Sequence, residues 1–182
     1  MVEIVFEAHS TTLDNESRLA SGWFDVGLSE LGKRQAKELG ERYKDEVFDA
    51  VFCSDLQRSY KTAETAFVDR DFKIVRDPRL RECNYGNLTR YPSEEVESVK
   101  TQHINKPFPG GESYNQVRER VGKFLVEVLM DYDDRKVMII GHRATQYSLE
   151  NIINSVSLCD AISKPFKWQP GWKYNLKDIQ QP

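Results

Sequence analysis

Three short apolar runs place the tightest constraint on the fold of this chain. They cover residues 2–6, 50–53 and 137–140, and none has the spacing of an amphipathic helix. Turn or charged residues bound each run, as is usual for buried central strands, and a helical segment follows each one. Alternating strands and helices predict an α/β fold, a three-layer α/β/α sandwich with a mostly parallel central sheet. In such sheets, ligands bind outside the carboxyl ends of the strands.

Capping signals locate two of the helices. Ser113 and Gln116 form a capping box that opens the clearest amphipathic segment of the chain. Ser54 and Gln57 repeat the signature directly after the second apolar run. This predicts a helix that begins within a residue or two of the strand, with Arg58 in its first turn.

The length of 182 residues favours one domain, residues 1–182. The regular spacing of apolar residues is lost between residues 84 and 112, where we expect at most a short helix after Pro92. We interpret this stretch as an insert that covers the pocket, because long loops in compact domains are usually functional or mobile. The tail is expected to wrap the surface and to end in an edge strand near residues 172–176.

Composition excludes several classes of protein. Hydrophobic residues make up 39% of the chain and charged residues 30%, and the net charge is −3, without the basic excess typical of nucleic-acid binding. No apolar run approaches the roughly 20 residues that span a bilayer, and Met1 leads straight into an alternating segment rather than a leader. We therefore expect a cytoplasmic protein that binds neither nucleic acid nor membrane.

Cys53, Cys83 and Cys159 show neither zinc-site nor disulfide spacing and are interpreted as reduced, mostly buried thiols.

Two of the three histidines, His9 and His142, follow predicted central strands. A single histidine in such a place is more often a structural hydrogen-bonding residue, but two at the ligand edge favour chemistry. One imidazole is a competent nucleophile toward phosphorus, and the other can donate a hydrogen bond to the phosphoryl oxygens.

Phosphoryl transfer also needs positive charge and a proton donor. Arg58 offers a bidentate donor in the first turn of a helix that starts at the same edge, although a surface ion pair is the commoner role. Glu82 opens the loop over the pocket, where a partly buried carboxyl group could protonate a departing alkoxide. An isolated glutamate is more often solvated.

The order of these residues resembles the histidine phosphatase superfamily, which has a phosphoglycerate mutase-like fold. The five matching segments are the opening stretch with His9, Thr12, Asn15, Gly22 and Gly32, then Ser54 to Ala63, Leu80 to Gly86, Pro109 to Ser113, and Gly141 with His142. They run in order from Val2 to about Ile153. Five ordered motifs are strong evidence of fold, whereas any one alone is weak.

The resemblance implies a phosphatase that works through a phosphohistidine on His9. It implies that Arg58 and His142 bind the phosphoryl group and that Glu82 protonates the leaving group. No metal or organic cofactor is implied, and a phosphorylated small molecule is the expected partner. Ser10, Thr12 and Asn15 are the further expected substrate contacts.

Three positions depart from the family pattern. The arginine that precedes the nucleophile is Ala8 here, the glycine that follows it is Ser10, and the position after the second histidine, often glycine, is Arg143. Losing one donor aimed at transition-state charge commonly costs about 10² to 10³ in rate. We expect Arg143 to enter the pocket and replace the missing guanidinium. Three departures together favour natural divergence over a single introduced change at position 8.

Other functions stay open at this point. A non-catalytic relative would bind a phosphorylated small molecule or protein in the same pocket, and a mutase-like phosphotransferase would share its residues. Glu82 favours catalysis, because a phosphate receptor gains nothing from an acid beside its ligand. A metal-dependent hydrolase is disfavoured, because neither histidine has a carboxylate or cysteine at short ligand spacing. The sequence does not identify the substrate or the oligomeric state.

Overall fold

The computed structural model describes residues 1–177 and contains one five-stranded sheet within that range. Its strand order is β3-β2-β4-β1-β5. Four strands are parallel, and β5 pairs with β1 in the antiparallel direction at the edge. The strands are β1 (Val2–Ala8), β2 (Ala50–Cys53), β3 (Ile74–Arg76), β4 (Lys136–Gly141) and β5 (Trp172–Leu176).

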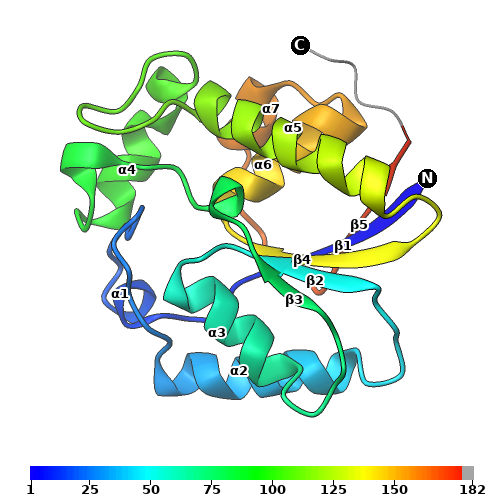
Figure 1. Cartoon of the computed structure of the whole chain (residues 1–182). Coiled ribbons are helices and arrows are strands. Elements are labelled where there is room, and N and C mark those ends of the chain that lie inside the picture. Colours follow the sequence, from blue (N-terminus) through cyan, green and yellow to red (C-terminus); the bar gives the residue numbers. More distant parts are fainter. Residues whose placement is uncertain (178–182) are drawn as a thin grey trace.

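Helices cover both faces of the sheet, as predicted, and form a three-layer sandwich (Figure 1). One layer holds α2 (Glu30–Arg42) and α3 (Gln57–Ala66). The opposite layer holds α5 (Tyr114–Asp131), α6 (Arg143–Asn154) and α7 (Leu158–Ser163).

The short helices α1 (Leu13–Glu16) and α4 (Ser93–Val99) lie beyond the carboxyl ends of β1 and β4 (Figure 1). Three 3-10 turns complete the elements, namely η1 (Pro78–Leu80), η2 (Gly86–Leu88) and η3 (Lys100–His103). Residues 84–112 thus contain a short helix after Pro92, as expected, together with two turns that the sequence pattern did not indicate.

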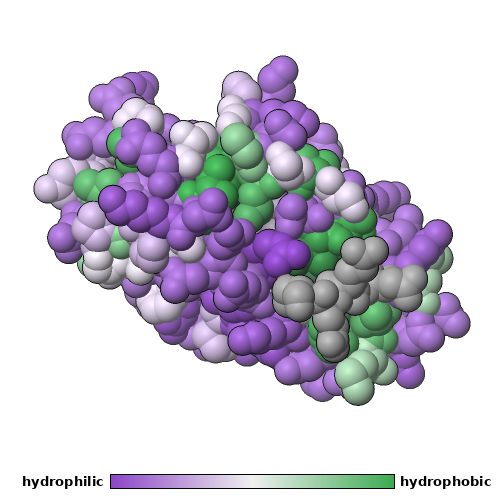
Figure 2. Space-filling model, turned by 90° about the horizontal axis from the view of Figure 1, so that it is seen from above, coloured by the Kyte–Doolittle hydropathy of each residue, from purple (hydrophilic) through white to green (hydrophobic). Residues whose placement is uncertain are grey.

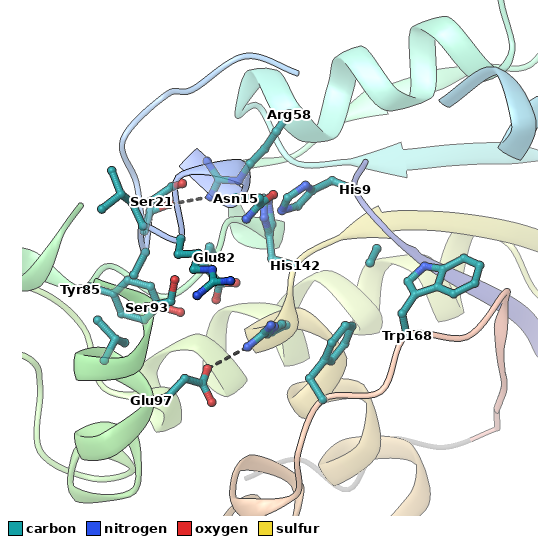
Figure 3. A pocket seen from close by; sticks show the side chains of 18 residues that line it. His9, Asn15, Ser21, Arg58, Glu82, Tyr85, Ser93, Glu97, His142 and Trp168 are labelled. Atoms are coloured by element: carbon teal, nitrogen blue, oxygen red, sulfur yellow. Dashed lines mark hydrogen bonds and ion pairs between the residues drawn. The ribbon is translucent and has the colours of Figure 1, made fainter. Parts of the chain in front are cut away.

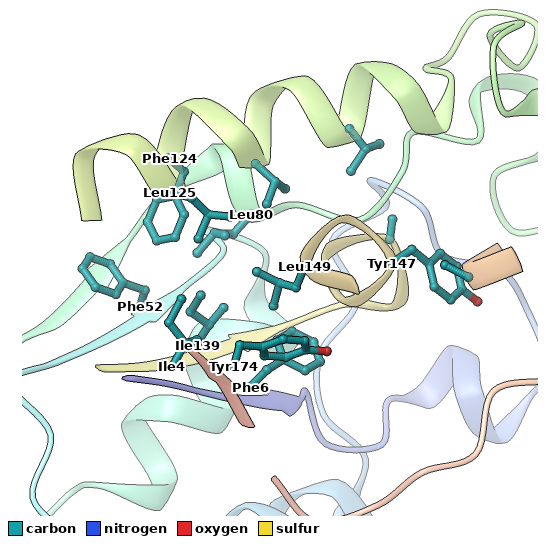
Figure 4. Packing of buried hydrophobic residues seen from close by; sticks show 14 of the residues in the cluster. Ile4, Phe6, Phe52, Leu80, Phe124, Leu125, Ile139, Tyr147, Leu149 and Tyr174 are labelled. Atoms are coloured by element: carbon teal, nitrogen blue, oxygen red, sulfur yellow. The ribbon is translucent and has the colours of Figure 1, made fainter. Parts of the chain in front are cut away.

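Side chains alternate between two hydrophobic cores because successive residues of a strand point to opposite faces. Ile4 and Phe6 of β1 and Ile139 of β4 pack toward α5 and α6 (Figure 4). Val5 of β1 and Met138 of β4 point the other way, toward α2 and α3. Both faces of the central strands are therefore buried, which explains why these strands have continuous apolar sequences.

One capping prediction is confirmed and the other is wrong. Ser113 caps α5, and its hydroxyl and the side chain of Gln116 form the expected reciprocal bonds. Ser54 does not cap α3, which begins at Gln57 with Leu56 as its N-cap residue. The Ser54 hydroxyl instead lies 2.7 Å from Nε2 of His142. Arg58 is nevertheless in the first turn of α3.

Among residues 1–177, no helix combines the length and the apolar character that crossing a membrane requires. Seen from above, the surface is mainly hydrophilic, and hydrophobic side chains show in smaller patches between polar ones (Figure 2). Strand β3 was not predicted. It has three residues, none of them buried, so it carries neither an apolar run nor a full alternation.

Close packing of α2 on α3 depends on Gly40. A Cβ atom at this position would lie 2.1 Å from the carbonyl oxygen of Ala66. We expect Gly40→Ala to lower the free energy of unfolding by about 1 to 3 kcal/mol, since overpacking outweighs the helix propensity of alanine. Gly122 in α5 is the matched control, because a Cβ there meets only Ile152 Cδ1 at 3.7 Å. Gly122→Ala should raise stability by about 0.5 to 1 kcal/mol, and denaturant unfolding measures both changes.

Candidate active site

A cavity of about 380 Å³ opens at the carboxyl edge of the central strands. Six of the eight residues predicted as site residues line it: His9, Asn15, Arg58, Glu82, His142 and Arg143. His9 and His142 directly follow β1 and β4, and Arg143 begins α6. Asn15 comes from α1, Arg58 from α3, and Glu82 from the loop after η1 (Figure 3). The edge at which parallel strands end is the place where such sheets bind ligands.

The hydrogen bond of His9 fixes which ring nitrogen is available. Its Nδ1 lies 2.8 Å from the carbonyl oxygen of Ser10. Because a carbonyl only accepts, Nδ1 carries the proton and Nε2 keeps its lone pair. Burial, together with the nearby charges of Arg58 and Arg143, lowers the pKa of His9 to about 3. At neutral pH, the ring is therefore an uncharged base with one free nitrogen.

His142 faces His9, and the two ring centroids are 5.0 Å apart. The side chain of His142 is buried, and Nε2 contacts the Ser54 hydroxyl. Its Nδ1 is buried without a hydrogen-bond partner among the described residues. Burial, followed by the charge of Arg58, holds the pKa of His142 well below its usual range. A buried polar atom without a hydrogen-bond partner is uncommon in folded proteins. Nδ1 of His142 is therefore available to bond a ligand in the cavity.

Arg58 is the largest side chain that is almost fully buried, with 2% of its surface exposed. Its Nη1 donates to the carbonyl oxygen of Phe24 at 3.0 Å, and its Nη2 donates to that of Gly22 at 2.6 Å. These two bonds orient the guanidinium from the loop that follows α1. Burial lowers the pKa of Arg58, but an arginine stays charged at any physiological pH.

Glu82 follows η1, and its buried carboxyl group packs against the first turn of α6. Its Oε1 accepts the backbone N–H of Cys83 at 2.7 Å and that of Ala144 at 3.2 Å. Oε2 makes no hydrogen bond within residues 1–177 and is the oxygen that can hold a proton. Burial raises the pKa of Glu82, against the opposing effects of these N–H groups and of Arg58 and Arg143. The group is thus suited to keep its proton at a higher pH than an exposed glutamate does.

Arg120 of α5 holds the backbone that carries Glu82. It donates to the carbonyl oxygens of Arg79, Arg81 and Glu82 at 2.6 to 2.9 Å, and it pairs with Glu112. Sequence reasoning missed this clamp, because an arginine on the polar side of an amphipathic helix gives no sign of which carbonyls it meets.

Two predicted substrate contacts are not in the cavity lining. Ser10 is buried, its backbone N–H donates to Thr62 Oγ1, and its carbonyl oxygen orients His9. Thr12 is fully buried and caps α1, where its Oγ1 accepts the N–H of Asn15 and its own N–H donates to Asn15 Oδ1. Both residues support their neighbours, and Asn15 alone of the three reaches the cavity.

Arg143 and Ala8 both line the cavity. Nη1 of Arg143 pairs with Glu97 of α4 at 2.8 Å, and Glu97 is labelled in Figure 3. The Arg143 guanidinium also lies over the Phe166 ring, 4.7 Å from the ring centroid. Trp168 also lines the cavity, on the other side of the histidines from Tyr85 and Ser93 (Figure 3).

Curated relatives cover most of this sequence. The chain is 32% identical over 150 residues to a probable phosphoglycerate mutase GpmB of Erwinia tasmaniensis, a match that covers 78% of this chain and 70% of the relative. It is 29% identical over 151 residues to phosphoserine phosphatase 1 of Hydrogenobacter thermophilus, with coverage of 78% and 71%.

Solved structures share the fold at lower sequence identity. The protein YhfR of Bacillus stearothermophilus superposes with a TM-score of 0.80 at 23% identity, covering 92% of this chain and 87% of that one. A mycobacterial glucosyl-3-phosphoglycerate phosphatase complexed with VO3 gives a TM-score of 0.78 at 23% identity, with coverage of 88% and 86%. Residues 4–158 match the family described as the histidine phosphatase superfamily (branch 1). With its paired histidines at the strand ends and this match, the chain belongs to the histidine phosphatase superfamily.

Proposed function

We propose that this chain hydrolyses a phosphomonoester of a small molecule through a phosphohistidine on His9. The observation that carries the proposal is the free Nε2 of a neutral His9 beside the His142 ring, with the raised pKa of Glu82 in the same cavity. Relatives named as phosphatases and phosphoglycerate mutases support a phosphorylated small molecule as the substrate.

The first step transfers the phosphoryl group to the protein. Nε2 of His9 attacks phosphorus, the bond from phosphorus to the ester oxygen breaks, and the departing alkoxide takes the proton from Oε2 of Glu82. In the second step, the Glu82 carboxylate removes a proton from water as the water oxygen attacks phosphorus. The bond to His9 then breaks, inorganic phosphate leaves, and Glu82 is protonated again.

Arg58 and His142 would stabilise the charge on the phosphoryl oxygens. Arg58 supplies a fixed positive charge that backbone carbonyls already orient. When the Ser54 hydroxyl donates to Nε2 of His142, Nδ1 keeps its proton and has no other acceptor. Donors oriented before the reaction cost no reorganisation as charge develops.

The decisive assay is hydrolysis of 4-nitrophenyl phosphate by the parent and by His9→Ala, without added metal. We expect the variant to lose at least about 10³-fold in kcat, since the nucleophile is gone. The parent should also form an acid-labile phosphoenzyme that the variant lacks. His103→Ala, outside the cavity lining, is the matched control. If neither protein hydrolyses the ester while vanadate still raises the melting temperature, the chain is a non-catalytic phosphate binder and the proposal is wrong.

The pH profile should identify the proton donor. His9 is neutral above about pH 3, whereas Glu82 donates only below its raised pKa, so kcat/KM should fall as pH rises through that pKa. Glu82→Gln should remove this alkaline limb and lower the rate about 10² to 10⁴-fold for an alkyl phosphate. The loss should be smaller for 4-nitrophenyl phosphate, whose leaving group needs little protonation. A limb that persists in the variant would assign the titration to another group or to the substrate.

We further propose that Arg143 supplies the guanidinium that Ala8 lacks, exchanging Glu97 for the phosphoryl oxygens when substrate binds. Arg143→Ala should then lower kcat/KM by about 10²-fold, as loss of one transition-state donor does. The double change Arg143→Ala with Ala8→Arg should recover part of that loss. Equal activity of Arg143→Ala and the parent would contradict the replacement.

A further inference from the structure

Lys100 is a buried cation that the proposed chemistry does not use. It lies where α4 ends and η3 begins. Lysine is rarely buried, because its ammonium group loses hydration unless it finds a partner. Nζ of Lys100 donates to Oε2 of Glu97 at 2.7 Å and lies 5.9 Å from the centre of the Tyr147 ring. Among residues 1–177, Glu97 is its one ion-pair partner.

Glu97 connects Lys100 to the cavity. It lines the cavity from α4 (Figure 3), and each of its two oxygens binds a different cation. Oε2 accepts from Nζ of Lys100, and Oε1 accepts from Nη1 of Arg143 at 2.8 Å. The preceding residue, Val96, is buried in the hydrophobic core and anchors α4. An exchange of partners at Glu97 therefore needs side-chain movement only.

The two ion pairs of Glu97 differ in how easily they separate. The side chains of Arg143 and Glu97 are 45% and 42% exposed, so water can replace either partner at little cost. The side chain of Lys100 is only 8% exposed. Removing the partner of a buried charge is strongly unfavourable, because water does not reach the charge that remains. Glu97 therefore keeps Lys100 when it releases Arg143.

We propose that Lys100 is a positioning residue that allows Arg143 to leave Glu97 for a phosphoryl group. The proposal rests on the proposed function, in which Arg143 moves to the phosphoryl oxygens. With Lys100 in place, the carboxylate that Arg143 leaves is still paired. Without Lys100, Glu97 would hold Arg143 alone, and after the exchange it would be an unpaired anion near a phosphoryl dianion. Lys100 thus sets the affinity of the cavity for a phosphoryl anion through Glu97.

A double-mutant cycle on phosphate affinity tests this role. Inorganic phosphate is titrated calorimetrically into the parent, Lys100→Met, Glu97→Gln and the double variant. Lys100→Met keeps a long side chain but removes its charge, and it should weaken phosphate binding about five- to tenfold. In the Glu97→Gln background, the same change should alter the dissociation constant by less than about twofold, because the carboxylate through which Lys100 acts is gone. Equal weakening in both backgrounds would overturn the proposal.

A matched control removes a lysine charge elsewhere. Lys123 is exposed on α5 and lies outside the cavity lining, so Lys123→Met should leave phosphate affinity unchanged. Melting temperatures establish that each variant is folded. If Lys100→Met does not fold, Lys100→Gln takes its place in the cycle with the same expected result, since its amide can still donate to Glu97 without a charge.

Turnover separates this proposal from the phosphatase proposal. If the parent hydrolyses 4-nitrophenyl phosphate, Lys100→Met should raise KM and leave kcat within about twofold, because the partner exchange accompanies binding. A loss confined to kcat would contradict the positioning role. If no ester is hydrolysed but the cycle shows the coupling, Lys100 acts as proposed and the phosphohistidine route fails. If hydrolysis depends on His9 but the cycle shows no coupling, the role of Lys100 alone fails.

Discussion

The parallel pairing of β1 with β4 is the constraint on which the site depends. Its register places Ala8 opposite Gly141, so the next residue of each strand, His9 and His142, leaves the sheet at the same edge. The N–H of His9 still donates to the carbonyl oxygen of Gly141, which extends the ladder by one bond. Buried strands resist slippage, because a shift of one residue would turn every side chain to the other face. The packing of the buried strands therefore holds the two imidazole rings close together.

The parts of the fold that could be predicted are those whose signal is local. The apolar runs of β1, β2 and β4 and the capping box of Ser113 each depend on neighbouring residues, and the structure reproduces them. Ser54 shows the limit of this reasoning. Its spacing to Gln57 suits a cap, but the close approach of β2 and β4 brings His142 within reach, and the hydroxyl bonds the imidazole instead.

The rest of the site depends on contacts between distant segments, which residue spacing does not encode. Arg120 lies about forty positions from the carbonyls it clamps, and Arg18 meets the backbone of Ser93. Thr12 follows the family pattern, yet it acts through the cap that positions Asn15. A motif therefore identifies which residues gather at the site, whereas the packing decides which of them touch a ligand.

The charge balance of the candidate site explains how its buried titratable groups are accommodated in the fold. Two buried imidazoles with depressed pKa values stay neutral, and the raised pKa of Glu82 favours its uncharged form. Of the two main cations, Arg58 is satisfied by carbonyl dipoles and Arg143 by the carboxylate of Glu97. In the proposed mechanism, a phosphoryl dianion would bring the counter-charge that Arg58 lacks and would compete with Glu97 for Arg143. Binding by this mechanism would replace the present partners of Arg143 with phosphoryl oxygens, and groups that are already held in place would need little reorganisation.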